Sequence, residues 1–108
     1  MSNEVTDLRS VTSQTFAEQL TTRFSIESGP SDAEEMELIE ATEKQSSPTQ
    51  EQFSLIFRAA SDTVPNQGQY TMKHEKLGVL ELFLVPVGKD DQGLYYEAFF
   101  NRLRKKAE

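Results

Sequence analysis

The stretch Tyr70–Arg102, YTMKHEKLGVLELFLVPVGKDDQGLYYEAFFNR, decides the fold, because its three dense apolar segments are separated by glycine-bearing or charged turns. Apolar residues that recur between turns of this kind are typical of antiparallel strands, so we expect a β-meander that builds the core. The stretch contains no nucleophile paired with a base, no cluster of metal ligands and no glycine-rich phosphate loop. It therefore predicts a fold and not a reaction.

The two C-terminal strands of this meander carry apolar residues on both sides. Val79–Val87 is apolar at nearly every position, which is typical of a strand that is covered on both faces. Pro86 lacks an amide donor, so it should lie at a sheet edge or at a point where pairing stops. We expect Gly88–Gly93 to form a hairpin loop and Leu94–Arg102 to return as the last strand.

One short helix is expected near the N-terminus. A side-chain oxygen of Thr12 or Ser13 can accept hydrogen bonds from the exposed amides of a first helical turn, and Phe16 and Leu20 supply an apolar stripe. We therefore expect a helix at about Ser13–Leu20. It would plug one end of the sheet or cover one of its faces.

Three strands are expected between this helix and the meander. In the first, Phe24 and Ile26 alternate with polar residues. In the second, over residues 34–42, the apolar parity changes near Leu38, and a β-bulge would explain the change. The third strand begins near Phe53 and ends in a turn-rich segment.

Six short strands with turns at this spacing predict a mainly β fold, either a small antiparallel barrel or a sandwich of about six strands with one short N-terminal helix. A chain of 108 residues is the usual size of one domain. We expect a flexible N-terminal segment over residues 1–11, a single β-rich domain over residues 12–102 and a basic C-terminal tail over residues 103–108.

The composition excludes several functional classes. The chain has no cysteine, which excludes disulfides, thiolate nucleophiles and cysteine-ligated zinc. The formal net charge is −7, and seven acids without a base lie between Glu27 and Glu43. Nucleic-acid binding needs a basic surface, so we expect no nucleic-acid partner. We interpret the acidic segment as a solvated strand face that favours solubility; a calcium site or a basic partner is the alternative.

The sequence also argues against a membrane partner. No apolar run approaches the ~18 residues that span a bilayer. The N-terminus is polar and acidic, unlike a signal peptide. We therefore expect a cytoplasmic protein.

One side of the last two strands needs a cover. Tyr96, Ala98 and Phe100 share the face that would fill the core. The opposite face must be covered by the helix, by the acidic hairpin or by another protein, because a large exposed apolar patch is an association site. The candidate partner surface consists of Phe83, Val85, Tyr95 and Phe99.

A second candidate is a set of polar residues in the same stretch: His74, Glu97, Asn101 and Arg102. His74 is the single histidine, and catalysis would require a nucleophile or a carboxylate within its reach. We interpret His74 as a structural residue that orders the turn before Gly78. For Glu97 and Arg102 we expect a structural ion pair across strands, with Arg58, Lys73 or Glu81 as partners.

Three segments carry a resemblance: FSLIF at 53–57, QGQYTMKHEKLGVLELFLVPVG at 67–88 and YYEAFFNR at 95–102. They resemble a family of small bacterial proteins of unknown function with a pattern close to F-S-L-x-F, Q-G-x-Y-x-x-x-H-x-x-L-G-x-x-x-L-F-L-V-P-V and Y-E-A-x-F-N-R. The resemblance covers about half the chain and implies no activity and no catalytic residue. Its association with genes for phage-tail-like collar proteins implies a structural or assembly role.

The function expected from these observations is a non-catalytic structural or adaptor domain that acts through protein–protein contacts, in a phage-tail-like or surface assembly. The expected partner is a protein, with a second copy of this chain as one form of it. We expect no catalytic residue, no cofactor and no metal. The alternative is a small-ligand-binding β-barrel, or a hydrolase that uses His74 with Glu97.

Overall fold

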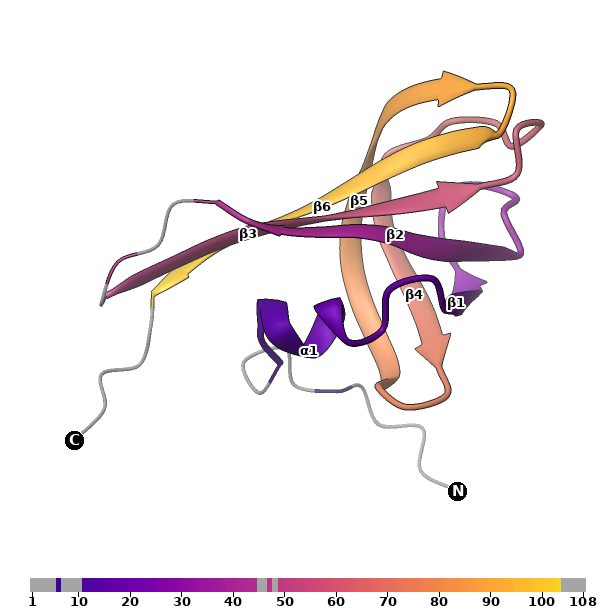
Figure 1. Ribbon diagram of the computed structural model, residues 1–108. Coiled ribbons are helices and arrows are strands. Elements are labelled where there is room, and N and C mark those ends of the chain that lie inside the picture. The colour runs from indigo at the N-terminus through magenta and orange to yellow at the C-terminus, as the bar shows by residue number, and fades with distance from the viewer. Residues whose placement is uncertain (1–5, 7–10, 45–46, 48, 104–108) are drawn as a thin grey trace.

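The computed structural model describes residue 6, residues 11–44, residue 47 and residues 49–103. In this part of the chain, six antiparallel strands form one closed barrel, accompanied by one short helix (Figure 1). The mainly β fold is therefore confirmed, and closure selects the barrel over the sandwich. The elements are α1 (Ser13–Ala17), β1 (Arg23–Ser28), β2 (Glu35–Glu43), β3 (Gln50–Ala59), β4 (Gly68–His74), β5 (Gly78–Asp90) and β6 (Gly93–Leu103), and the strand order around the barrel is β1-β2-β3-β6-β5-β4.

The helix α1 begins as expected but ends three residues earlier than Leu20. Thr12 is the N-cap, and its side chain accepts a hydrogen bond from the Thr15 amide. After Ala17 the chain tightens into a turn that ends at Thr21, whose φ of 68° lies in the left-handed region. The Thr21 amide then donates to the carbonyl of Leu38 at 2.7 Å. The helix ends at Ala17 because the chain turns there towards β2.

The bulge expected in β2 is confirmed. The register between β2 and β3 shifts between Leu38 and Glu40. Before the shift Met36 and Leu38 are buried, and after it Ala41 packs against the core. The extra residue therefore lets apolar side chains of both parities face the interior of the barrel.

The prediction that Val79–Val87 is covered on both faces is wrong. Leu80, Leu82 and Leu84 are buried in the barrel, but Phe83 and Val87 are 54% and 53% exposed. A barrel strand has one inner and one outer face, and the described residues leave the outer face of β5 open. The apolar side chains on the outer face of β5 are therefore part of the protein surface and not of a second core.

The expected loop over Gly88–Gly93 is also too long. β5 continues to Asp90, β6 begins at Gly93, and a two-residue turn joins them. The Asp90 carboxylate orders this turn, because its Oδ1 accepts hydrogen bonds from the amides of Gln92 at 2.8 Å and Gly93 at 3.2 Å.

The expectation for Pro86 is confirmed, since the ladder between β5 and β4 ends at Leu84, two residues before the proline. From Val85 onwards β5 pairs with β6 instead, and that register shifts between Pro86 and Gly88. β5 therefore changes partner along its length, with β4 on its first half and β6 on its second.

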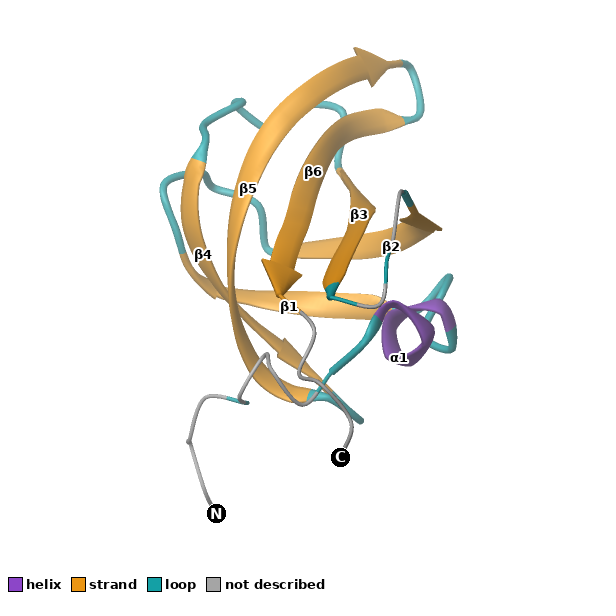
Figure 2. Cartoon of the chain, turned by 90° about the vertical axis from the view of Figure 1, so that its left-hand side faces the viewer, coloured by secondary structure: helices purple, strands orange, loops and turns teal. Residues whose placement is uncertain are grey.

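An aromatic cluster fills the space that this exchange of partners leaves beside β6. β6 pairs with β3 as far as Leu103 but with β5 only from Gly93 to Glu97. Figures 1 and 2 show β3 and β6 running together beyond this point, with α1 lying against the same end. Phe16 of α1 is fully buried there, and its ring centroid lies 6.1 Å from that of Phe53 and 5.8 Å from that of Phe100. The helix thus plugs the end of the barrel.

The expected N-terminal segment and basic tail lie mostly outside the described residues, with Thr6, Val11 and Leu103 as exceptions. Thr6 donates to the carbonyls of Leu77 and Val79, and Val11 is buried in the core. No helix in the described ranges is both long and apolar enough to cross a membrane.

A first prediction concerns the two glycines of the β5–β6 hairpin. A Cβ built on Gly93 would lie 2.6 Å from the carbonyl oxygen of Ala59, whereas one on Gly88 would meet nothing within 4 Å. Gly93→Ala should therefore cost about 1–3 kcal/mol of unfolding free energy, because the backbone of β3 must move. Gly88→Ala, the matched control, should change it by less than about 0.5 kcal/mol. Urea unfolding measures both, and equal effects would contradict the packing described.

A second prediction concerns two buried tyrosines whose rings meet edge to face at 5.7 Å. The hydroxyl of Tyr96 is buried and has no hydrogen-bond partner among the described residues, whereas that of Tyr70 donates to the carbonyl of Asn66. Tyr96→Phe should leave stability unchanged or raise it by up to about 1 kcal/mol, and Tyr70→Phe should lower it by about 0.5–1.5 kcal/mol. Thermal unfolding of the two variants gives the comparison; a larger loss for Tyr96→Phe would show that its hydroxyl is satisfied.

Candidate functional site

His74 lies at the end of β4, with 5% of its surface exposed, and orders the turn that follows it. Its Nδ1 accepts hydrogen bonds from the backbone amides of Lys76 at 3.0 Å and Leu77 at 3.1 Å. Its Nε2 lies 2.8 Å from Oγ1 of Thr22, which precedes β1. The structure thus gives His74 the turn-ordering contacts that the sequence suggested.

These contacts fix the tautomer of the ring. The hydroxyl of Thr22 donates its proton to the carbonyl of Gln19 at 2.6 Å, so it can only accept from the imidazole. Nε2 therefore carries the proton and Nδ1 does not. Burial lowers the pKa of His74 below its ordinary value, which agrees with a neutral ring. Because both nitrogens are engaged, neither has a free position from which to take a proton from a substrate.

Glu97 does not meet His74. The histidine faces the barrel interior, where its ring lies 4.3 Å from that of Phe24, whereas Glu97 is on the outer face of β6, between Val85 of β5 and Ile56 of β3. The pair that the hydrolase alternative requires is therefore on two sides of the barrel wall. One of the alternative partners expected for Glu97, an arginine, is engaged elsewhere.

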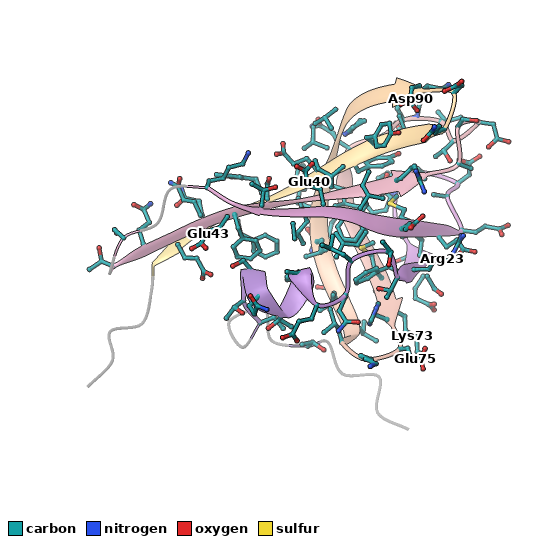
Figure 3. All side chains as sticks on the ribbon, viewed as in Figure 1. Arg23, Glu40, Glu43, Lys73, Glu75 and Asp90 are labelled. Atoms are coloured by element: carbon teal, nitrogen blue, oxygen red, sulfur yellow. The ribbon has the colours of Figure 1, made fainter. Side chains whose placement is uncertain are left out.

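That arginine is Arg58, whose Nη2 lies 2.6 Å from Oε1 of Glu37 on the neighbouring strand β2. This carboxylate raises the pKa of Arg58. The pair spans the outer face of β2 and β3, and Figure 3 shows Glu40 of β2 directed away from the barrel. It has the character of a structural cross-strand contact.

Asn101 and Arg102 lie at the far end of the β3–β6 ladder. The Asn101 side-chain oxygen accepts hydrogen bonds from the side-chain amides of Gln50 at 2.7 Å and Gln52 at 3.3 Å, so it joins the two strands. The backbone of Arg102 pairs with Glu51, and its side chain lies outside the described atoms. The four polar candidates are thus spread over three places and form no common site.

The residues of the candidate partner surface lie on the outer face of β5 and β6. The β5–β6 ladder ends at the pair Val85–Glu97, and Phe83 and Phe99 each lie two residues beyond this pair on their own strands. Both phenylalanines are 54% exposed, whereas Val85 and Tyr95 are half-buried. The hydroxyl of Tyr95 donates to the Asp90 carboxylate at 3.0 Å. The surface therefore has two open aromatic rings around one valine and one carboxylate.

The structure adds a hollow that sequence reasoning missed. It has a volume of about 340 Å³ and lies where the β1–β2 and β3–β4 connections meet. The acidic excess of the sequence was a partial signal, but Asp62 comes from a loop far along the chain. No three histidine or acidic side chains of the described residues are placed to hold a metal ion. The lining consists of Asp32, Ala33, Glu34, Glu35, Ala60, Asp62 and Thr63.

Neither the curated proteins nor the solved structures contain a match to this chain. A family model does match, over residues 11–100, and its description gives no activity. The match covers α1 and the first strands as well as most of the second half of the sequence. The chain belongs to this family, the domain of unknown function DUF6916.

Proposed function

We propose that the protein is a non-catalytic structural or adaptor domain of the cytoplasm that acts by binding another protein through the outer face of β5 and β6. The observation that carries the proposal is the exposure of Phe83 and Phe99 on one face of a closed barrel. Aromatic side chains are enriched in protein interfaces and supply much of their binding energy.

The chemistry of this face supports a protein as the ligand. Its apolar side chains lie next to Glu97 and to the hydrogen bond between Tyr95 and Asp90, so polar groups border an apolar centre. Standard protein interfaces have this arrangement, with aromatic residues at the centre and hydrogen-bonding groups at the rim. The face is the outer wall of a closed barrel and carries two exposed aromatic rings, which suits a macromolecular partner.

The biological setting is part of the same proposal. The resemblance to small bacterial proteins associated with phage-tail-like genes favours a role in such an assembly or in a surface assembly. A hydrolase that uses His74 and Glu97 receives no support, because the two side chains face opposite sides of the wall.

The prediction is that replacing both exposed rings removes binding and leaves the fold intact. The double variant Phe83→Ser with Phe99→Ser should have the same free energy of unfolding in urea as the native chain, within about 0.5 kcal/mol, since both rings are already open to solvent. Its affinity for the partner should fall at least about 30-fold, the effect of losing one interface residue worth about 2 kcal/mol. Isothermal titration with a partner isolated by the native protein measures the fall.

The matched control is Val64→Ser, because Val64 is 57% exposed but lies in the β3–β4 connection, away from this face. It should bind like the native chain. Equal binding by the double variant and the control, or a native chain that stays monomeric and retains no partner, would contradict the proposal.

A further inference from the structure

Two turns meet at the end of the barrel where His74 lies. The first follows α1 and is held to β2, because the Thr21 amide donates to the carbonyl of Leu38 and the Leu38 amide donates to the carbonyl of Thr22. The second joins β4 to β5 and carries the amides of Lys76 and Leu77. The imidazole of His74 bridges the two, with Nδ1 on the second turn and Nε2 on the first.

This bridge works with a neutral ring alone. A proton on Nδ1 would point at the amides of Lys76 and Leu77, which are donors themselves, so two hydrogen bonds would be lost and three donors would face one another. Nε2 cannot compensate, because it already carries its proton. Protonation therefore converts a satisfied ring into one whose buried donor has no acceptor.

The charged groups near the ring do not supply one. Glu75 and Lys76 flank it on its own turn and shift its pKa in opposite directions, and Figure 3 places Glu75 at the outside of this turn. Phe24 of β1 packs against the ring in a tilted arrangement, which is mildly favourable to a cation but offers no acceptor for Nδ1. From the turn after α1 the ring meets Thr22, and the nearby Arg23 is paired with Glu35 at 3.1 Å.

A third segment is attached to the same turn. The hydroxyl of Thr6 donates to the carbonyl of Leu77 at 2.7 Å, and its amide donates to the carbonyl of Val79 at 2.6 Å. Between these anchors Gly78 has a φ of 82°, and a Cβ built on it would lie 2.9 Å from the Thr6 hydroxyl. The conformation of this turn therefore determines whether the Thr6 contacts are kept.

We propose that His74 is a proton-sensitive latch, which holds the β4–β5 turn to the turn after α1 at neutral pH and releases the two turns from each other when its imidazole is protonated. The β3–β6 part of the barrel lies outside the latch and stays folded. The latch is separate from the candidate partner surface, because it lies at the end of the barrel and shares no residue with that surface.

The direction of the pH dependence follows from the burial of the ring. Burial lowers the pKa of His74 in the closed form, whereas the open form titrates near the ordinary value of about 6.5. The latch is therefore fully closed above about pH 6.5 and weakens as the pH falls below it, towards the lower pKa of the closed form. Between pH 7.5 and 5.5 the opening constant should rise, by at most about tenfold, because the open form titrates near 6.5 and the closed form below it.

Amide hydrogen exchange by NMR on the full chain tests the proposal. Protection factors, which correct for the intrinsic pH dependence of exchange, are followed for the amides of Lys76, Leu77 and residue 22, with Leu55 and Ala98 as core references. The first three should lose protection from pH 7.5 to 5.5, by at most about tenfold, and the references should not change. Protection that is independent of pH, or that falls equally in the references, would overturn the latch.

Two variants separate a latch from general acid sensitivity. Asn offers an amide oxygen close to the position of Nδ1 but does not titrate, so His74→Asn should keep Lys76 and Leu77 protected at both pH values. Thr22→Val removes the acceptor of Nε2, so the amide of residue 22 should no longer respond to pH whereas those of Lys76 and Leu77 still do. The same loss of protection in His74→Asn as in the native chain would overturn the proposal, as would nitrogen chemical shifts that place the proton on Nδ1 at pH 7.5.

Discussion

The ladder between β3 and β6 is the constraint on which the rest of the structure depends. It runs without a register shift from Gln50–Leu103 to Ala59–Leu94. Since successive side chains alternate between faces, this one register places Phe53, Leu55 and Phe57 in the core together with Tyr96, Ala98 and Phe100. It also places Phe99 on the outside. A slip of β6 by one residue would turn Tyr95 and Phe99 into the core and Tyr96 and Ala98 to the outside.

Sequence alone predicts the features that depend on neighbours along the chain. The N-cap at Thr12, the bulge near Leu38 and the turn after His74 follow from local side chains, and the structure contains all three. The extent of Val79–Val87 burial does not follow, because an apolar run does not reveal whether its outer face will be covered. The end of α1 was missed for a similar reason, since it depends on a bond from Thr21 to a strand far along the chain.

The candidate site divides in the same way. The role of His74 in its own turn was accessible from sequence, but its second partner, Thr22, is 52 residues away and carries no signal near the histidine. Alternation predicted that Phe83 and Phe99 share a side of the sheet, and the register confirms their outward direction. The polar set failed to assemble, because parity separates His74 from Glu97 and Arg58 found a closer carboxylate in Glu37.

The exchange of partners along β5 has a mechanical consequence. Its first half is bonded to β4 and its second half to β6, and the change occurs between Leu84 and Val85. A tension that draws β4 away from β6 at this point runs lengthwise through the covalent backbone of β5. Elsewhere around the wall the same tension would be carried by rows of hydrogen bonds, which separate one after another. A load between β4 and β6 therefore passes from the β4–β5 hydrogen bonds, along the covalent backbone of β5, to the β5–β6 hydrogen bonds.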